Sequence, residues 1–153
     1  MKEIAFTKTG LSWGWLGNMS AHPVEYRGKL YPTTEHLFQA MRLPEDHPAI
    51  EEIRKHNSPM RAKMVIKDFQ EDFIITPRSK ADIENMMVTL LLKIDTYPDL
   101  KSELINSKGL DIIEDCSNRP TESGPFWGAK KTSSGWVGNN HLGKCWMYLR
   151  DLL

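Results

Sequence analysis

The chain has 153 residues, enough for one domain with its own hydrophobic core, and its 40% hydrophobic and 26% charged residues are ordinary for a globular protein. Twenty basic residues balance twenty acidic ones, which argues against a protein whose main task is to hold duplex DNA, although a local basic groove stays compatible. The two cysteines form no C-x-x-C pair, so neither a zinc site nor a redox motif is supported.

The N-terminal sequence and the hydropathy favour a cytoplasmic protein without a membrane partner. The first residues, M-K-E-I-A-F-T-K, lack the apolar run of a signal peptide, and no stretch of about 18 apolar residues occurs. Two reduced cysteines fit the same compartment.

Short strands are expected mainly in the N-terminal part. Residues 2–6 are compatible with a strand, and residues 23–26 and 29–31 flank Arg27-Gly28, a pattern that predicts a hairpin. One more strand is expected at residues 110–113.

Helices fill most of the remaining chain. They are expected to begin at Thr33 or Thr34, Pro48, Ser58, Ser79, Pro98 and Asn139 or Asn140. The first is expected to end near Leu43, before Pro44. The clearest core element is the fourth, whose apolar residues recur at i, i+3, i+4, i+7, i+8 and i+11. They are Ile83, Met86, Met87, Leu90, Leu91 and Ile94. Residues 116–138, rich in Gly, Pro, Ser and Thr, are expected to form one long loop. The sequence thus predicts a single helix-rich α+β domain over residues 1–153.

Glu35, in the sequence P-T-T-E-H-L-F-Q-A, falls in the first turn of its helix. Free backbone N–H groups and the helix dipole favour a negative charge there by roughly 0.3–1 kcal/mol, so an acidic first turn by itself needs no function. Gln39 lies one turn and Arg42 about two turns along the same face. A carboxylate, an amide and a cation on one stripe are unusual for a merely solvated face, which makes Glu35 a candidate catalytic residue.

The histidines give no metal-ligand spacing, and neither a metal nor a cofactor is expected. His36 follows Glu35 directly, so the two side chains point about 100° apart on an ideal helix and do not form a dyad. A packed or supporting position is the default for His36.

The sequence F-W-G-A-K at residues 126–130 places an aromatic residue between polar flanks. Such a residue is often a lid over the core, and the alternative is that Trp127 stacks on a base. Lys130, with free backbone amides near a helix start, is suited to hold a phosphate. Asn139 is a natural helix cap or, alternatively, a ligand contact. The chain has no phosphate-loop, Rossmann or nucleophile-elbow motif.

These motifs resemble those of the YbiA-like, or NADAR (NAD and ADP-ribose associated), family. The resemblance runs in order along nearly the whole chain. Its matching pieces are L-G-N at 16–18, P-T-T-E-H-L-F-Q-A at 32–40, S-P-M-R-A-K-M at 58–64, I-I-E-D at 112–115, R-P at 119–120, F-W-G-A-K at 126–130 and G-N-N-H-L-G-K-C-W-M-Y-L-R at 138–150.

The resemblance implies a YbiA-like fold and an enzyme that cleaves N-glycosidic bonds. Its substrates would be ribosylamino-pyrimidine phosphates of riboflavin biosynthesis or ADP-ribose attached to guanine, free or in nucleic acid. It implies that Glu35 is catalytic and that the Trp127 indole faces the same ligand. The other substrate-binding residues would be Asn18, His36, Gln39, Arg42, Gly128, Lys130 and Asn139. Of these, the cations Arg42 and Lys130 are expected to hold phosphate.

Two departures from the family pattern keep other interpretations open. Many members have Lys where this chain has Arg42, and a guanidinium cannot form a Schiff base. Many also have an Asp shortly before F-W-G, where this chain has S-G-P at 123–125, so Glu122, Asp115 or Glu114 would supply a second carboxylate, or none would. The alternatives are a module that binds ADP-ribose or a related nucleotide without cleaving it, and a structural protein whose motifs only build the core and cap helices.

Overall fold

A computed structural model of the chain describes residues 2–153 and confirms the helix-rich α+β class. The elements in chain order are β1 (Glu3–Phe6), η1 (Gly14–Leu16), β2 (Val24–Tyr26), β3 (Lys29–Tyr31), α1 (Thr34–Ala40), α2 (Ala49–Arg54), α3 (Pro59–Ile66), η2 (Lys67–Asp72), α4 (Lys80–Thr96), α5 (Pro98–Asn106), β4 (Asp111–Glu114), α6 (Ser123–Trp127), β5 (Lys130–Thr132), β6 (Gly135–Val137) and α7 (His141–Leu152). Backbone contacts group them into two compact units, residues 18–97, and residues 98–153 with the segment through Gly17. The single domain over residues 1–153 stays a prediction.

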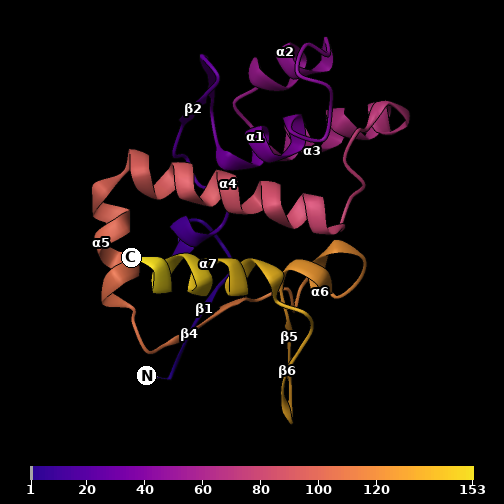
Figure 1. Cartoon of the computed structure of the whole chain (residues 1–153). Helices are drawn as coiled ribbons and strands as arrows, with labels where there is room; N and C mark the ends of the chain where they lie inside the picture. Colours follow the sequence, from indigo (N-terminus) through magenta and orange to yellow (C-terminus); the bar gives the residue numbers. More distant parts are fainter. Residues whose placement is uncertain (1) are drawn as a thin grey trace. The chain divides into compact units, whose positions relative to one another are not determined.

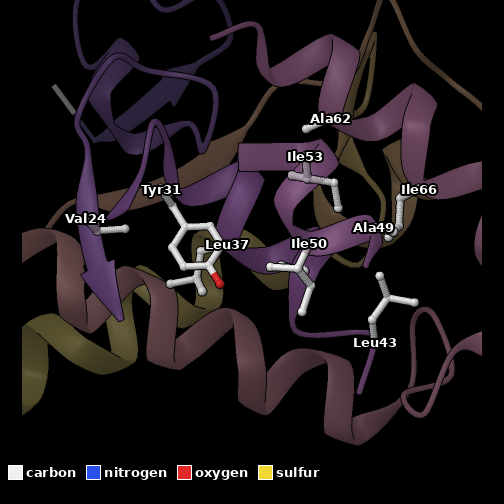
Figure 2. Close-up of a cluster of buried hydrophobic side chains, with 10 residues drawn as sticks. Val24, Tyr31, Leu37, Leu43, Ala49, Ile50, Ile53, Ala62 and Ile66 are labelled. Carbon is white, nitrogen blue, oxygen red and sulfur yellow. The ribbon is translucent and has the colours of Figure 1, made fainter. Parts of the chain in front are cut away.

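In the unit of residues 18–97, the predicted hairpin β2–β3 and four α-helices surround an apolar cluster (Figures 1 and 2). Arg27 and Gly28 have φ values of 51° and 79°, as a two-residue hairpin turn of type I′ requires. Helix α1 packs against α3 and α4, and α2 packs against α3. The cluster consists of Val24, Tyr31, Leu37, Ala40, Leu43, Ala49, Ile50, Ile53, Ala62 and Ile66. Because α1 buries Leu37 and Ala40 in this cluster, the opposite side of α1 faces away from the cluster.

Side-chain caps start three of these helices. The hydroxyls of Thr33, Ser58 and Ser79 each accept a hydrogen bond from the backbone N–H three residues on. The predicted starts at Ser58 and Ser79 are thus confirmed, and Thr33 is the cap of α1. The expected end near Leu43 is wrong, because α1 ends at Ala40 and its cap residue, Met41, follows directly.

The long helix α4 buries a more polar stripe than the apolar pattern predicts. Met86, Leu90 and Ile94 are buried, but Leu91 is 43% exposed. Three polar or charged residues of the same helix are instead fully buried: Asp82, Thr89 and Lys93. Hydropathy alone could not indicate them, because each is buried through partners that lie far away in the sequence or on the preceding turn.

In the other unit, β1 and β4 pair in parallel, with Ile4 opposite Ile112, and α7 packs on β4 (Figure 1). The packing is close at Gly143, where a Cβ atom would collide with the carbonyl oxygen of Ile112. The indole N–H of Trp146 donates to the Leu16 carbonyl at 2.8 Å, which ties α7 to the N-terminal segment.

Two predictions for this unit are wrong. Residues 116–138 do not form one long loop, because they contain α6 and the antiparallel hairpin β5–β6. The strands therefore do not come mainly from the N-terminal part. The predicted start of the last helix at Asn139 or Asn140 is confirmed, because Asn140 directly precedes α7, but its side chain does not cap the helix. Its amide instead bonds both ways to β4, accepting from Glu114 N and donating to the Ile112 carbonyl. That long-range pairing outcompetes the local cap.

Candidate functional site

Glu35 lies in the first turn of α1, as predicted, on the side away from the apolar cluster. Its backbone N–H donates to the Asn18 carbonyl at 3.0 Å, and the residue is only 8% exposed. The carboxylate oxygen Oε1 accepts a hydrogen bond from Gln39 Nε2 at 3.0 Å. Among residues 2–153, no hydrogen bond reaches the other oxygen, Oε2. Glu35 is therefore held by one oxygen and has the second available for a ligand or water.

Gln39 on α1 and Arg42, two residues past the end of α1, continue this arrangement on the same side. Arg42 Nη1 donates to Gln39 Oε1 at 3.2 Å. The same guanidinium binds Asp82 of α4 in a two-point ion pair, with Nε–Oδ1 at 3.0 Å and Nη2–Oδ2 at 2.8 Å. The result is a continuous polar chain from Asp82 through Arg42 and Gln39 to Glu35.

Asp82 belongs to this hydrogen-bonded series of polar side chains, and the sequence analysis did not identify it. It is fully buried near the start of α4, where its backbone N–H donates to the Ser79 hydroxyl. In sequence it reads as an ordinary acidic residue in a first helical turn. An i, i+40 partner such as Arg42 leaves no periodic signal.

Asn18 and His36 also lie close to the start of α1. Asn18 Oδ1 accepts from the Thr34 hydroxyl at 2.9 Å, so Asn18 is attached to the turn that carries Glu35. His36 is fully buried, with Nδ1 2.8 Å from the Thr33 hydroxyl and Nε2 2.6 Å from the His56 carbonyl. Burial lowers the pKa of His36, so its ring is neutral at pH 7. Both ring nitrogens have protein partners, which fits the packed position expected as the default.

The second group of predicted residues lies in the other unit. Trp127 ends α6, is 9% exposed and meets Phe126 edge to face at 4.9 Å between ring centroids. Gly128 follows at a point where a Cβ atom would collide with the backbone of Glu114. The glycine in F-W-G is thus required by close packing on β4. Lys130 and Asn139 are exposed.

His141, at the start of α7, is a further residue that sequence reasoning did not single out. Its ring lies 4.4 Å from that of Phe126 and 6.5 Å from that of Trp127. Burial, together with the charge of Lys144, lowers the pKa of His141. A neutral imidazole therefore lies beside the aromatic rings of Phe126 and Trp127.

Two of the three candidates for a second carboxylate are engaged in local contacts. Glu114 forms an ion pair with Arg119 at 3.7 Å. Asp115 accepts from both the backbone N–H and the hydroxyl of Ser117. Glu122 is exposed.

A pocket of about 410 Å³ opens on the other side of α1. It is lined by Leu37 and Ala40 of α1, which lie about 140–200° around the helix from Glu35 and within about 160° of Gln39, and by Met41, which follows the end of α1. None of the predicted site residues lines this pocket.

Within residues 2–153 no cluster of three or more His, Cys, Asp or Glu side chains is placed to hold a metal ion. In the same range, no helix is long and apolar enough to cross a membrane. Cys116 and Cys145 are both free and buried.

Several known proteins are similar to this chain over most of its length. Residues 5–153 match the NADAR domain family. The N-glycosidase YbiA of Escherichia coli (strain K12) is 30% identical over 150 residues, 98% of this chain and 88% of that protein. The chloroplastic riboflavin biosynthesis protein PYRR of Arabidopsis thaliana is 28% identical over 127 residues, 80% of this chain but 20% of that protein. The NMR structure of the E. coli protein YbiA matches with a TM-score of 0.78 and 27% identity, over 99% of this chain and 86% of that chain.

Proposed function

The chain belongs to the NADAR domain family, and on that premise we propose that it hydrolyses the N-glycosidic bond of a ribosyl-phosphate or ADP-ribosyl compound. A relative named as an N-glycosidase and another named for riboflavin biosynthesis support this class of reaction. The candidate substrates are ribosylamino-pyrimidine phosphates and ADP-ribosylated guanine, the latter either free or in nucleic acid.

The observation that carries the proposal is the state of the Glu35 carboxylate. Breaking a C1–N bond builds positive charge on the sugar C1 and its ring oxygen, and a carboxylate stabilises that charge. Glu35 is fixed through Oε1 by Gln39, while no group of residues 2–153 forms a hydrogen bond to Oε2. Glu35 also lies in the first turn of α1, where free backbone N–H groups stabilise negative charge. Glu35 is therefore suited to act as a base and charge stabiliser.

In the proposed reaction, Glu35 accepts a proton from a water molecule as the water oxygen bonds to C1. The C1–N bond breaks, its electron pair goes to the nitrogen of the base, and that nitrogen takes up a proton. The products are a ribosyl compound with a free anomeric hydroxyl and the free base. Hydrolysis in this form requires no oxidant, reductant or metal ion.

The other site residues would bind the substrate. Trp127 would stack on the base, since indole and base both offer flat faces. Asn18, Gln39 and Asn139 would orient the ribose, and Lys130 would hold phosphate, with Gly128 allowing the close approach of the chain.

The second candidate is a module that binds ADP-ribose without cleaving it. It is favoured by the local pairing of Glu114 and Asp115 and by the serine that replaces an aspartate before F-W-G. In this case Glu35 would contact the ligand without promoting hydrolysis.

Base release from a defined set of compounds tests the proposal. The set is ADP-ribose, NAD, a ribosylamino-pyrimidine phosphate and ADP-ribosylated guanine DNA, followed by chromatography of the released base. We expect release from at least one compound, a loss of about 10²-fold or more in Glu35→Gln, and no loss in the exposed control Glu84→Gln. Binding of ADP-ribose without release of any base would favour the binding module. Equal turnover of Glu35→Gln and the wild type would remove Glu35 from the mechanism.

A further inference from the structure

We propose that Asp82 and Arg42 form a positioning pair that fixes the Gln39 amide and, through it, the carboxylate of Glu35. The effect on turnover rests on the proposed function, whereas the effect on the Gln39 amide does not. In this assignment Arg42 does not bind phosphate, the role expected from the sequence.

The Asp82–Arg42 pair is rigid because both partners are fixed from several sides. Two parallel hydrogen bonds, at 3.0 and 2.8 Å, set the plane of the guanidinium. Asp82 is fully buried, and its Oδ2 also accepts from the backbone N–H of Arg78 at 2.8 Å. The Arg42 side chain is 12% exposed and lies over the ring of Phe38, 4.8 Å from its centroid.

This pair determines which way the Gln39 amide points. A guanidinium offers only donors, so the group of Gln39 that faces Arg42 must be the oxygen, Oε1. The amide nitrogen Nε2 then faces Glu35 and donates to Oε1 of that carboxylate. Without Arg42, the Gln39 amide has no fixed partner on that side and is free to rotate away. The direction of the hydrogen bonds from Arg42 through Gln39 to Glu35 is therefore set by the ion pair of Arg42 with Asp82.

The same geometry argues against Arg42 as a phosphate ligand. Its Nε and one Nη2 hydrogen are committed to Asp82, and Nη1 reaches Gln39. A phosphate that used the Nε/Nη2 edge of the guanidinium would have to displace Asp82 and leave a buried carboxylate without its counter-charge, which is costly. A phosphate at the Nη1/Nη2 edge would compete with Gln39 for Nη1. The exposed Lys130 has no such competitor among the hydrogen bonds of the described residues.

Arg42→Lys is the most informative variant, because it keeps the positive charge next to Asp82. A lysine ammonium cannot hold two parallel contacts to Asp82 and a third to Gln39 in one plane. Asp82→Asn removes the counter-charge and leaves a buried guanidinium, so it carries a larger risk of misfolding. The matched controls are Arg61→Lys on α3 and Asp95→Asn on α4, both at exposed positions.

The first measurement is the ¹⁵N NMR signal of the Gln39 side-chain amide, assigned by its absence in Gln39→Met. We expect slow hydrogen exchange of this amide in the wild type, and exchange faster by about tenfold or more in Arg42→Lys with the backbone spectrum otherwise retained. Glu35→Gln should shift the same signal, and the two control variants should not. A Gln39 amide that exchanges equally fast in the wild type and in Arg42→Lys would overturn the proposal.

The second measurement separates positioning from phosphate binding. In single-turnover cleavage, a positioning role predicts that Arg42→Lys lowers the cleavage rate by about 10- to 100-fold, with the Kd for ADP-ribose within about threefold of the wild-type value. A raised Kd with an unchanged cleavage rate would instead identify Arg42 as a phosphate ligand and refute the assignment. If the wild type cleaves no compound, the proposed function fails, and the NMR result still decides the positioning claim.

Discussion

Lys93 offers a sharp test of the physical reasoning, because a fully buried ammonium must cost stability in a way that depends on pH. The residue lies on α4 and donates from Nζ to the Ser20 hydroxyl at 2.6 Å. Burial lowers the pKa of Lys93 from 10.5 to about 7. The change to make is Lys93→Met, which keeps an unbranched side chain and removes the ionisable group.

The sign follows from proton binding in the two states. Between pH 7 and 10.5 the unfolded chain keeps the proton on Lys93 and the folded chain releases it, so the stability of the wild type rises with pH. The lowered pKa of Lys93 corresponds to a cost of about 4 kcal/mol at pH 7 and about 1 kcal/mol at pH 9.5. Lys93→Met escapes this cost at every pH. Its stability relative to the wild type should therefore decline by about 3 kcal/mol across that range.

The assay is urea unfolding of both proteins at half-unit steps from pH 7 to 9.5, a range that avoids the titration of His22, the other partner of the Ser20 hydroxyl. Loss of the Lys93 hydrogen bond in the variant changes the difference in unfolding free energy between the two proteins by a constant amount. It does not change how that difference depends on pH. A difference in unfolding free energy that is constant with pH would refute the burial argument for Lys93.

Three further predictions follow from the fold. Because burial lowers the pKa of His36, the unfolded chain takes up that proton first as the pH falls, so stability is lost below about pH 6.5, and His36→Gln should flatten the decline in unfolding free energy measured between pH 7 and 5. Gly143→Ala should lower the melting temperature, at a cost of about 1–3 kcal/mol, because the added methyl group meets the Ile112 carbonyl; a higher melting temperature would mean that α7 does not pack this closely on β4. Burial raises the pKa of the Cys116 thiol and raises that of Cys145 to about 11, so a thiol reagent at pH 8 should label neither cysteine in the native protein and both in denaturant.

Local sequence signals predicted the elements whose stability is local. Ser58 and Ser79 identify helix starts through hydrogen bonds that span three residues, and Arg27-Gly28 identifies a hairpin through its backbone dihedrals. The long-loop prediction for residues 116–138 failed because glycines there serve close packing. Gly128 lies against the backbone of Glu114, a contact that no local rule anticipates.

The candidate site was predictable along one helix but not between helices. The spacing was sufficient to place Glu35 and Gln39 on one face of α1, with Arg42 just past its end on the same side. The partner that orients them, Asp82, is 40 residues from Arg42, and only the packing of α1 on α4 brings the two together. The phosphate role expected for Arg42 followed from its charge alone, and charge does not reveal whether a guanidinium is already paired.

The most direct test of the account is a crystal structure of Glu35→Gln with ADP-ribose bound. The account predicts that the anomeric carbon lies within about 3–4 Å of the side chain at position 35, close enough for attack by a water molecule held there. A sugar bound in the pocket on the opposite side of α1, against Leu37 and Met41, would contradict the assignment of the Glu35 carboxylate as the group that carries the chemistry.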